Sequence, residues 1–209
     1  MSYYIGIGGQ MRSGKDTVAD YLAPKIGYER ASFASNVKRI YCETFGVDIE
    51  FVEKWKVIPE NPPGFDSTVR QGLQLIGDGF RKIKGDIWVE LALRDKNRKA
   101  VISDCRYINE LKAVKDSGGY NILMCRPGYE NNDPNGSEAQ IRPLADYFAS
   151  TKQEGVVKAG LDAPYGCEFV DFFIINNGTV EDLFAKSDQF GRFLRECHQV
   201  GGIIPTAGG

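Results

Sequence analysis

Residues 9–15 read Gly9-Gln10-Met11-Arg12-Ser13-Gly14-Lys15, a loop that opens with glycine and closes on Gly-Lys. The apolar, β-rich segment 2–8 precedes it, and apolar residues at helical spacing follow it between positions 18 and 22. A loop of this spacing between a strand and a helix is the Walker A pattern, which encloses phosphates. The alternative is a glycine-rich turn that only joins strand to helix, with Arg12 and Lys15 solvated. Strand, spacing, glycines, lysine and helix together favour the phosphate-binding loop.

The chemistry of this loop suits the triphosphate of ATP. Glycines let consecutive backbone N–H groups point inward, and the following helix presents its positive end to the phosphates. We predict that Lys15 bridges the β and γ phosphates. Asp16 stands where the usual pattern has a magnesium-binding Ser or Thr, so we rank Asp16 above Thr17 as a ligand of Mg²⁺, and Thr17 could instead bond the α phosphate. The predicted ATP-binding residues of the loop are Gly9, Arg12, Ser13, Gly14, Lys15, Asp16 and Thr17.

Strand and helix patterns alternate along the rest of the chain. Apolar runs predict further strands at 28–33, 100–103, 120–125 and 169–175, with helical spacing between them. Such alternation implies right-handed crossovers and a mainly parallel sheet with helices on both faces. We therefore predict an α/β fold, a three-layer sandwich around a five-stranded sheet, as a single domain over residues 1–209. Three prolines within 57–66 predict an irregular connection there.

Ligands of parallel sheets bind at the carboxyl ends of the strands, where residues 8–14, 104–106 and 126–128 would meet. Asp104 follows an apolar run and is a further candidate for orienting Mg²⁺, but capping the next helix is an equally good interpretation. Transfer to a phosphate needs cations more than a base, because the attacking oxygen is already anionic. Guanidinium groups fit phosphate oxygens, and the arginines at suitable places are Arg70, Arg81, Arg106, Arg126 and Arg142.

Residues 126–135 are rich in proline, glycine and asparagine, which is typical of an irregular excursion. We predict a lid over about 127–155 that closes over the nucleotides and excludes water, which would otherwise accept the phosphoryl group. Its candidate residues are Ser137, Glu138 and Arg142. The alternative is a simple surface loop.

The composition of the chain indicates which kinds of binding partner to expect. Twenty-six basic against 28 acidic side chains give a formal net charge of -2, so we expect no stable binding of nucleic acid. No apolar run approaches the roughly 18 residues that a spanning helix needs, and no charged leader opens the chain, so we expect a cytoplasmic protein without membrane association. Five scattered cysteines lack the spacing of a zinc or redox site, and we expect reduced thiols.

Several short pieces of sequence occur in a recognisable order. They are residues 12–17 (Arg-Ser-Gly-Lys-Asp-Thr), Phe33-Ala34 with Lys38, Arg70 with Leu73-Gln74 and Gly77, Asp104-Cys105-Arg106-Tyr107 with Asn109-Glu110, Arg126-Pro127-Gly128 with Ser137-Glu138, and Asn176-Asn177-Gly178-Thr179. Their order resembles that of the bacteriophage deoxynucleoside monophosphate kinases, in the P-loop nucleoside monophosphate kinase superfamily, over nearly the whole chain. The Lys-Asp-Thr form of the loop is normal in that family. A phage origin would place the protein in the host cytoplasm.

This resemblance implies further site residues. The phosphate of the acceptor would be held by Lys38 and Arg70, within an acceptor-binding insertion at about 34–84, and by Arg106, at the end of a later strand. Arg126 would face the transferring group, and Asn177 would lie near the donor base. The remaining acceptor-site residues would be Phe33, Gln74 and Glu110. Structural alternatives compete with these roles. For Phe33 we favour the core over base stacking, and for Lys38, taken alone, we favour a solvated helix face over a ligand role. Glu110 could form an ion pair with Arg106 or another cation.

The combined patterns predict a kinase that transfers the γ-phosphoryl group of ATP to a deoxynucleoside monophosphate, with Mg²⁺ as cofactor, for DNA precursor synthesis. The predicted catalytic residues are Lys15, Asp104, Arg106 and Arg126. One alternative is a P-loop kinase that phosphorylates a hydroxyl of a modified pyrimidine nucleotide, of DNA or of another small metabolite, with Asp104 as base. Another is a nucleotide-binding switch, although the chain lacks the Asn-Lys-x-Asp element that reads guanine. A homodimer stays open.

Overall fold

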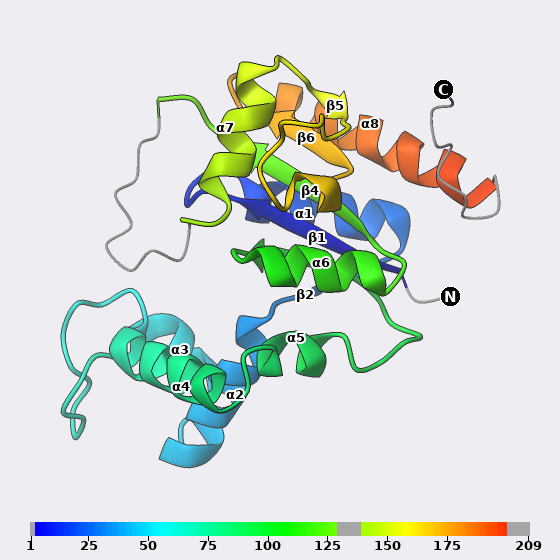
Figure 1. Ribbon diagram of the computed structural model, residues 1–209. Helices are drawn as coiled ribbons and strands as arrows, with labels where there is room; N and C mark the ends of the chain where they lie inside the picture. Colours follow the sequence, from blue (N-terminus) through cyan, green and yellow to red (C-terminus); the bar gives the residue numbers. More distant parts are fainter. Residues whose placement is uncertain (1–2, 129–138, 200–209) are drawn as a thin grey trace. The chain divides into compact units, whose positions relative to one another are not determined.

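The computed structural model describes residues 3–128 and 139–199. These residues form two compact units (Figure 1). The first unit contains the described residues up to Arg30 and from Lys96 onward, and the second contains residues 31–95. The whole of the predicted insertion at 34–84 falls within the second unit.

A six-stranded sheet in the order β2-β3-β1-β4-β6-β5 forms the centre of the first unit. Its strands are β1 (Tyr3–Gly9), β2 (Glu29–Ala31), β3 (Lys99–Cys105), β4 (Tyr120–Cys125), β5 (Gly155–Val156) and β6 (Phe172–Ile175). Strand β1 pairs in parallel with β3 and β4, and β4 pairs in parallel with β6. The predicted, mainly parallel sheet is thus confirmed, but it has six strands and not the predicted five. The additional strand is β5, which runs antiparallel to β6 and was not predicted because two residues carry no periodicity.

Helices cover both faces of this sheet, as the three-layer prediction requires (Figure 1). They are α1 (Lys15–Ile26), α6 (Ile108–Asp116), α7 (Arg142–Ser150) and α8 (Val180–Gln199), with a short 3-10 turn at Cys167–Phe169. Consecutive residues of β6 point to opposite faces. The ring of Phe172 lies 5.5 Å from Phe190 of α8, and the ring of Phe173 lies 5.6 Å from Phe148 of α7. Helix α1 shares the core of α8, since Leu22 and Phe190 belong to one buried cluster.

The second unit is helical, with α2 (Ala34–Phe45), α3 (Ile49–Trp55), α4 (Val69–Ile83) and α5 (Ile87–Ala92) around a small core of Tyr41, Val52 and Val69. Helix α4 begins where Thr68 caps it. The Thr68 hydroxyl accepts a hydrogen bond from Gln71 N at 3.2 Å, and the Gln71 side chain accepts one from Thr68 N at 3.0 Å. The predicted irregular connection at 57–66 is confirmed, whereas the short helix α3 was not predicted.

The predicted lid range contains a helix that packs on the sheet. Helix α7 occupies 142–150, and its Leu144, Ala145 and Phe148 are buried, because an apolar face at helical spacing packs on the sheet. Closure of a lid at about 127–155 over the nucleotides stays a prediction. Arg142 is the half-buried first residue of α7. Ser137 and Glu138 lie outside the described residues.

All five cysteines are free thiols, as predicted. Burial raises the pKa of Cys125 and of Cys167 to about 11, which keeps both thiols protonated. Within the part of the chain that the structure describes, no helix combines the length and apolarity needed to cross a membrane.

Candidate active site

The strand registers bring four segments to one edge of the sheet. Gly8 of β1 lies opposite Cys105 of β3, Gly9 lies opposite Met124 of β4, and Cys125 of β4 lies opposite Ile175 of β6. The loop after β1, the end of β3 and the residues after β4 therefore meet at the carboxyl edge, as predicted. The residues after β6 join them there.

The loop between β1 and α1 has a backbone that its glycines make possible. Gly9 has φ 147° and Gly14 has φ 99°, in the region that favours glycine. A Cβ atom on Gly9 would lie 2.4 Å from Met124 O, and one on Gly14 would lie 2.8 Å from Asn176 Nδ2. Arg12 also adopts a positive φ, 61°, which costs free energy in a residue with a side chain. Neighbouring strands thus fix the turn that the sequence pattern predicted.

Polar groups of this loop suit a polyphosphate. The Lys15 ammonium donates hydrogen bonds to Gly9 O at 2.8 Å and to Gln10 O at 2.5 Å, so it lies against the start of the loop. The Ser13 hydroxyl is fully buried and has no hydrogen-bond partner among the described residues. Because an unpaired buried hydroxyl is costly, a phosphate oxygen is a fitting partner for it.

Asp16, in the first turn of α1, is held by two residues that the sequence did not single out. Ser103 Oγ donates to Asp16 Oδ1 at 2.7 Å, and Arg30 Nη2 donates to the same oxygen at 3.1 Å. Burial would raise the pKa of Asp16, but the hydrogen bonds from Ser103 and Arg30 and the charges of Arg30 and Lys15 hold it below its ordinary value. The side chain is therefore a carboxylate at neutral pH.

Asp104 follows Ser103 at an irregularity of β3. Gly6 of β1 lies opposite Ile102 and Gly8 lies opposite Cys105, so β3 has an extra residue there, as in a β-bulge. The half-buried Asp104 does not cap α6, because Tyr107 is the N-cap residue of that helix, and this alternative is wrong. Carboxylate and hydroxyl oxygens are what Mg²⁺ prefers, and one or two carboxylates suffice for it. Asp16, Thr17 and Asp104 fit such an ion chemically.

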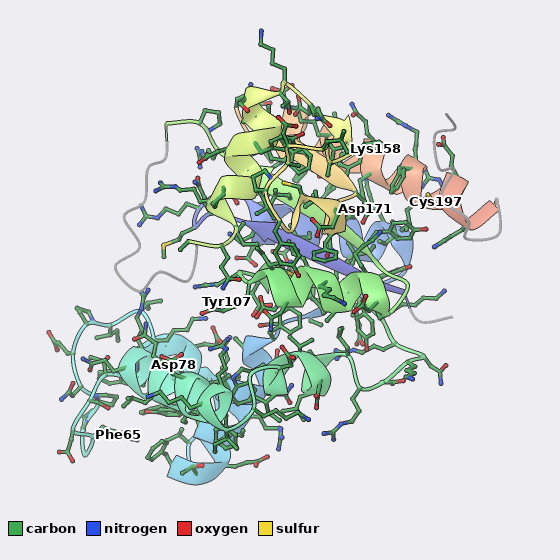
Figure 2. The ribbon with its side chains drawn as sticks, in the orientation of Figure 1. Phe65, Asp78, Tyr107, Lys158, Asp171 and Cys197 are labelled. Atoms are coloured by element: carbon green, nitrogen blue, oxygen red, sulfur yellow. The ribbon has the colours of Figure 1, made fainter. Side chains whose placement is uncertain are left out.

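Glu110 has its partners on the backbone. It is 3% exposed, and its Oε2 accepts hydrogen bonds from Arg106 N at 2.7 Å and from Tyr107 N at 3.1 Å. The Gln140 side chain accepts a further one from Ile108 N at 3.1 Å. Figure 2 labels Tyr107 at this start of α6. Glu110 thereby fixes the backbone that carries the exposed Arg106, and its role in acceptor binding stays a prediction.

Two residues at the ends of β4 and β6 contact the phosphate loop. Arg126 Nη1 donates a long hydrogen bond, 3.5 Å, to Arg12 O. Asn176 Nδ2 donates to Ser13 O at 3.0 Å. The resemblance implies a role for Asn177, and no role was predicted for Asn176. The Asn177 side chain accepts a hydrogen bond from Lys186 at 3.2 Å, and its position near the donor base stays a prediction.

The remaining predicted acceptor residues belong to the second unit. Phe33 is 3% exposed, in line with the core alternative. Lys38 forms an ion pair with Glu53 of α3, with 2.6 Å between Nζ and Oε1, and so is not simply solvated. Arg70 and Gln74 are exposed and lie one turn apart on α4. Their roles stay predictions.

A mainly parallel sheet with a phosphate-binding loop between β1 and α1 is the arrangement of the P-loop fold. The chain is similar to a protein of Acanthamoeba polyphaga mimivirus described as "Putative deoxynucleotide monophosphate kinase", with 27% identity over 201 residues, 87% of this chain and 92% of that protein. It is also similar to an uncharacterized protein of Ictalurid herpesvirus 1 (strain Auburn), with 26% identity over 152 residues, 68% of this chain and 56% of that one.

Solved structures give more distant likenesses. The dephospho-CoA kinase from Campylobacter jejuni has 14% identity and a TM-score of 0.46, with 95% of this chain and 100% of that chain covered. The shikimate kinase from Acinetobacter baumannii, in complex with shikimate, has 17% identity and a TM-score of 0.46, with 93% and 96% covered. No family model matches the chain.

Proposed function

We propose that this protein is an ATP-dependent deoxynucleoside monophosphate kinase, which converts ATP and a deoxynucleoside monophosphate to ADP and the deoxynucleoside diphosphate. The observation that carries the choice of acceptor is the similarity to the mimivirus protein, which extends over 87% of this chain and 92% of that one. The choice of donor is supported by the phosphate loop, with Lys15 against its start and the unpaired Ser13 hydroxyl inside it.

The loop would bind the β and γ phosphates through its amides, Ser13 and Lys15, with the side chain of Arg126 beside it. Asp16, Thr17 and Asp104 would hold Mg²⁺. When bound, that ion would offset the negative charge that develops on the phosphates during transfer. Arg126 is the arginine best placed to meet the same charge, since its guanidinium group already lies against Arg12 O.

The acceptor's phosphate oxygen would form a bond to the γ phosphorus while the bond between that phosphorus and the β-γ bridging oxygen breaks, releasing ADP. Since the attacking oxygen is already anionic, no general base is needed, and cations must instead offset the repulsion between the two substrates. Arg106, Lys38 and Arg70 are the proposed cations. Lys38 would leave its ion pair with Glu53 and bind the phosphate of the acceptor instead.

The proposal is tested with purified protein, ATP, Mg²⁺ and a panel of the four common deoxynucleoside monophosphates and their ribonucleotide counterparts. Release of ADP is followed by a coupled assay, and the product is identified by anion-exchange chromatography. We expect ADP release that depends on at least one deoxynucleoside monophosphate, with the diphosphate as product. ATP hydrolysis at the same rate without any acceptor would support a switch instead. A product phosphorylated on a hydroxyl would support the alternative kinase.

A further inference from the structure

Asp16 creates an electrostatic problem for a phosphate-binding loop. It lies directly after Lys15, in the first turn of the helix whose amino end would face the phosphates. It forms an ion pair with Arg30, with 3.1 Å between Nη2 and Oδ1, as expected of a carboxylate. A carboxylate there would repel a polyphosphate, whereas the Ser or Thr of the usual pattern is neutral. The surrounding residues must therefore offset this charge if the loop is to bind a triphosphate well.

Arg30 of β2 is placed to do so. Its Nη2 donates to Asp16 Oδ1 at 3.1 Å, and its Nη1 donates to Asp16 O at 3.2 Å, so the planar guanidinium group spans the side chain and the backbone of one residue. The same Nη2 donates to Ser103 Oγ at 3.0 Å, and Ser103 donates onward to Asp16 at 2.7 Å. Arg30, Ser103 and Asp16 thus form a closed ring of hydrogen bonds, all within the first unit.

Other charges near Asp16 do not replace Arg30. Lys15 donates hydrogen bonds to the carbonyls of the loop, Gly9 O and Gln10 O, and its charge is the one proposed to meet the phosphates. Asp20, one turn along α1, adds a second negative charge, and it too is paired with Arg30, at 3.3 Å. One guanidinium group therefore serves two carboxylates on the face of α1 next to β2 and β3. Ser103 is neutral, so it orients Asp16 without offsetting its charge.

We propose that Arg30 is the counter-ion that allows this loop to bind a polyphosphate despite Asp16, and that it is a positioning residue acting on the nucleotide through Asp16. The inference rests on the proposed binding of a nucleoside triphosphate by the loop. It predicts that loss of Arg30 weakens binding only while Asp16 carries its charge. A residue that contacted the phosphates itself, or that merely supported the fold, would not show this dependence.

The test is calorimetric titration of ATP in EDTA, without divalent metal, so that it reports repulsion between the loop and the nucleotide. Arg30→Met should raise the Kd about tenfold, and Asp16→Asn in the same variant should return the Kd to within about twofold of wild type. Ser103→Ala removes a hydrogen bond but no charge and should change the Kd by less than about threefold. Lys25→Met is the matched control, since Lys25 is an exposed cation of α1 paired with Asp188 at 3.0 Å, and its loss should leave the Kd nearly unchanged.

Each outcome decides the matter. An unchanged Kd in Arg30→Met would refute the inference while leaving nucleotide binding intact. A weakened Kd that Asp16→Asn does not restore would assign Arg30 to direct contact or to the fold, and circular dichroism of the variant separates these two. Absence of heat with wild-type protein, in EDTA and with Mg²⁺ alike, would instead remove the proposed function on which the inference rests.

Discussion

Replacing Lys115 with methionine should destabilise the protein by leaving a buried carboxylate unpaired. Lys115 of α6 donates to Asp171, just before β6, with 2.6 Å between Nζ and Oδ1. Asp171 is labelled in Figure 2. The two side chains are only 19% and 10% exposed. The other oxygen of Asp171 accepts a hydrogen bond from Asn121 N at 2.8 Å. Lys115→Met keeps most of the side-chain volume but removes the only charge in this arrangement that balances Asp171.

The expected loss of stability follows from the interactions that Asp171 keeps when Lys115 is replaced. Breaking a buried ion pair by removing one partner costs about 3–5 kcal/mol. Asn121 N still donates to Asp171, and Lys115 is not wholly buried, so we expect the lower end, about 3 kcal/mol. Asp171→Asn removes the stranded charge. The double variant Lys115→Met/Asp171→Asn should therefore lose only about 1 kcal/mol, close to the net value of a hydrogen bond.

The loss should depend on pH in a defined direction. Burial raises the pKa of Asp171 above its ordinary value of 3.8, and the charge and hydrogen bond of Lys115 and the hydrogen bond from Asn121 offset only part of that rise. Without Lys115 the folded pKa must rise further. A carboxyl group whose pKa is higher in the folded state destabilises the fold when ionised. Stability is therefore regained as pH falls through the folded pKa toward 3.8, and the full cost is present at neutral pH.

Urea unfolding, followed by circular dichroism at pH 7.5 and at pH 5, measures the effect. The free energy difference between wild type and Lys115→Met should shrink at the lower pH, and the double variant should show no such change. If Lys115→Met lost less than about 1 kcal/mol at pH 7.5, or the same amount at both pH values, the buried charge would not be the cause.

Three further predictions concern the site. Gly14→Ala should abolish measurable ATP binding, because φ 99° is unfavourable for alanine and its Cβ atom would lie 2.8 Å from Asn176 Nδ2. The control is Gly64→Ala, at φ 82° in open space, which should cost only about 1–2 kcal/mol of stability and leave ATP binding intact in calorimetry. Lys15→Met should lower kcat at least about 10³-fold with an unchanged circular dichroism spectrum, and near-normal turnover would contradict the assigned site. Arg106→Ala should raise the KM for the acceptor or lower kcat while the Kd for ATP is kept, and equal loss of ATP binding would show that Arg106 serves the donor.

The positions of five strands along the chain and the phosphate loop could be predicted because both depend on local signals. The strand before Gly9, the Gly-Lys pair and the helix after it lie within about 25 residues, and each shows a periodicity of its own. The meeting of these segments at the carboxyl edge of the sheet could be predicted because parallel strands end at the same edge. This rule placed Asp104 and Arg126 beside the loop. Helix α7 was missed because proline and glycine just before it suggested an irregular segment, while burial of Phe148 depends on β6, which comes later in the chain.

Residues that act through partners distant in sequence could not be found this way. Ser103 and Asp16 are 87 positions apart, and Asn176 is 163 positions from the Ser13 carbonyl that it contacts. Neither Ser103 nor Asn176 belongs to a motif whose chemistry names its partner. Arg30 is one of two charged residues on a three-residue strand, where an exposed, solvated side chain would be the ordinary expectation.

These distant contacts bear on why the loop holds its shape. Arg12 and Gly14 adopt left-handed conformations, and only Gly14 does so without a side-chain penalty. The loop carbonyls are held from outside, with Ser13 O bonded to Asn176 after β6 and Arg12 O bonded to Arg126 after β4. A phosphate-binding loop must be shaped before the ligand arrives, since ordering it on binding would consume affinity. The sequence of residues 9–15 therefore specifies what the loop can bind, whereas β4 and β6 supply the hydrogen bonds that keep it in a binding shape.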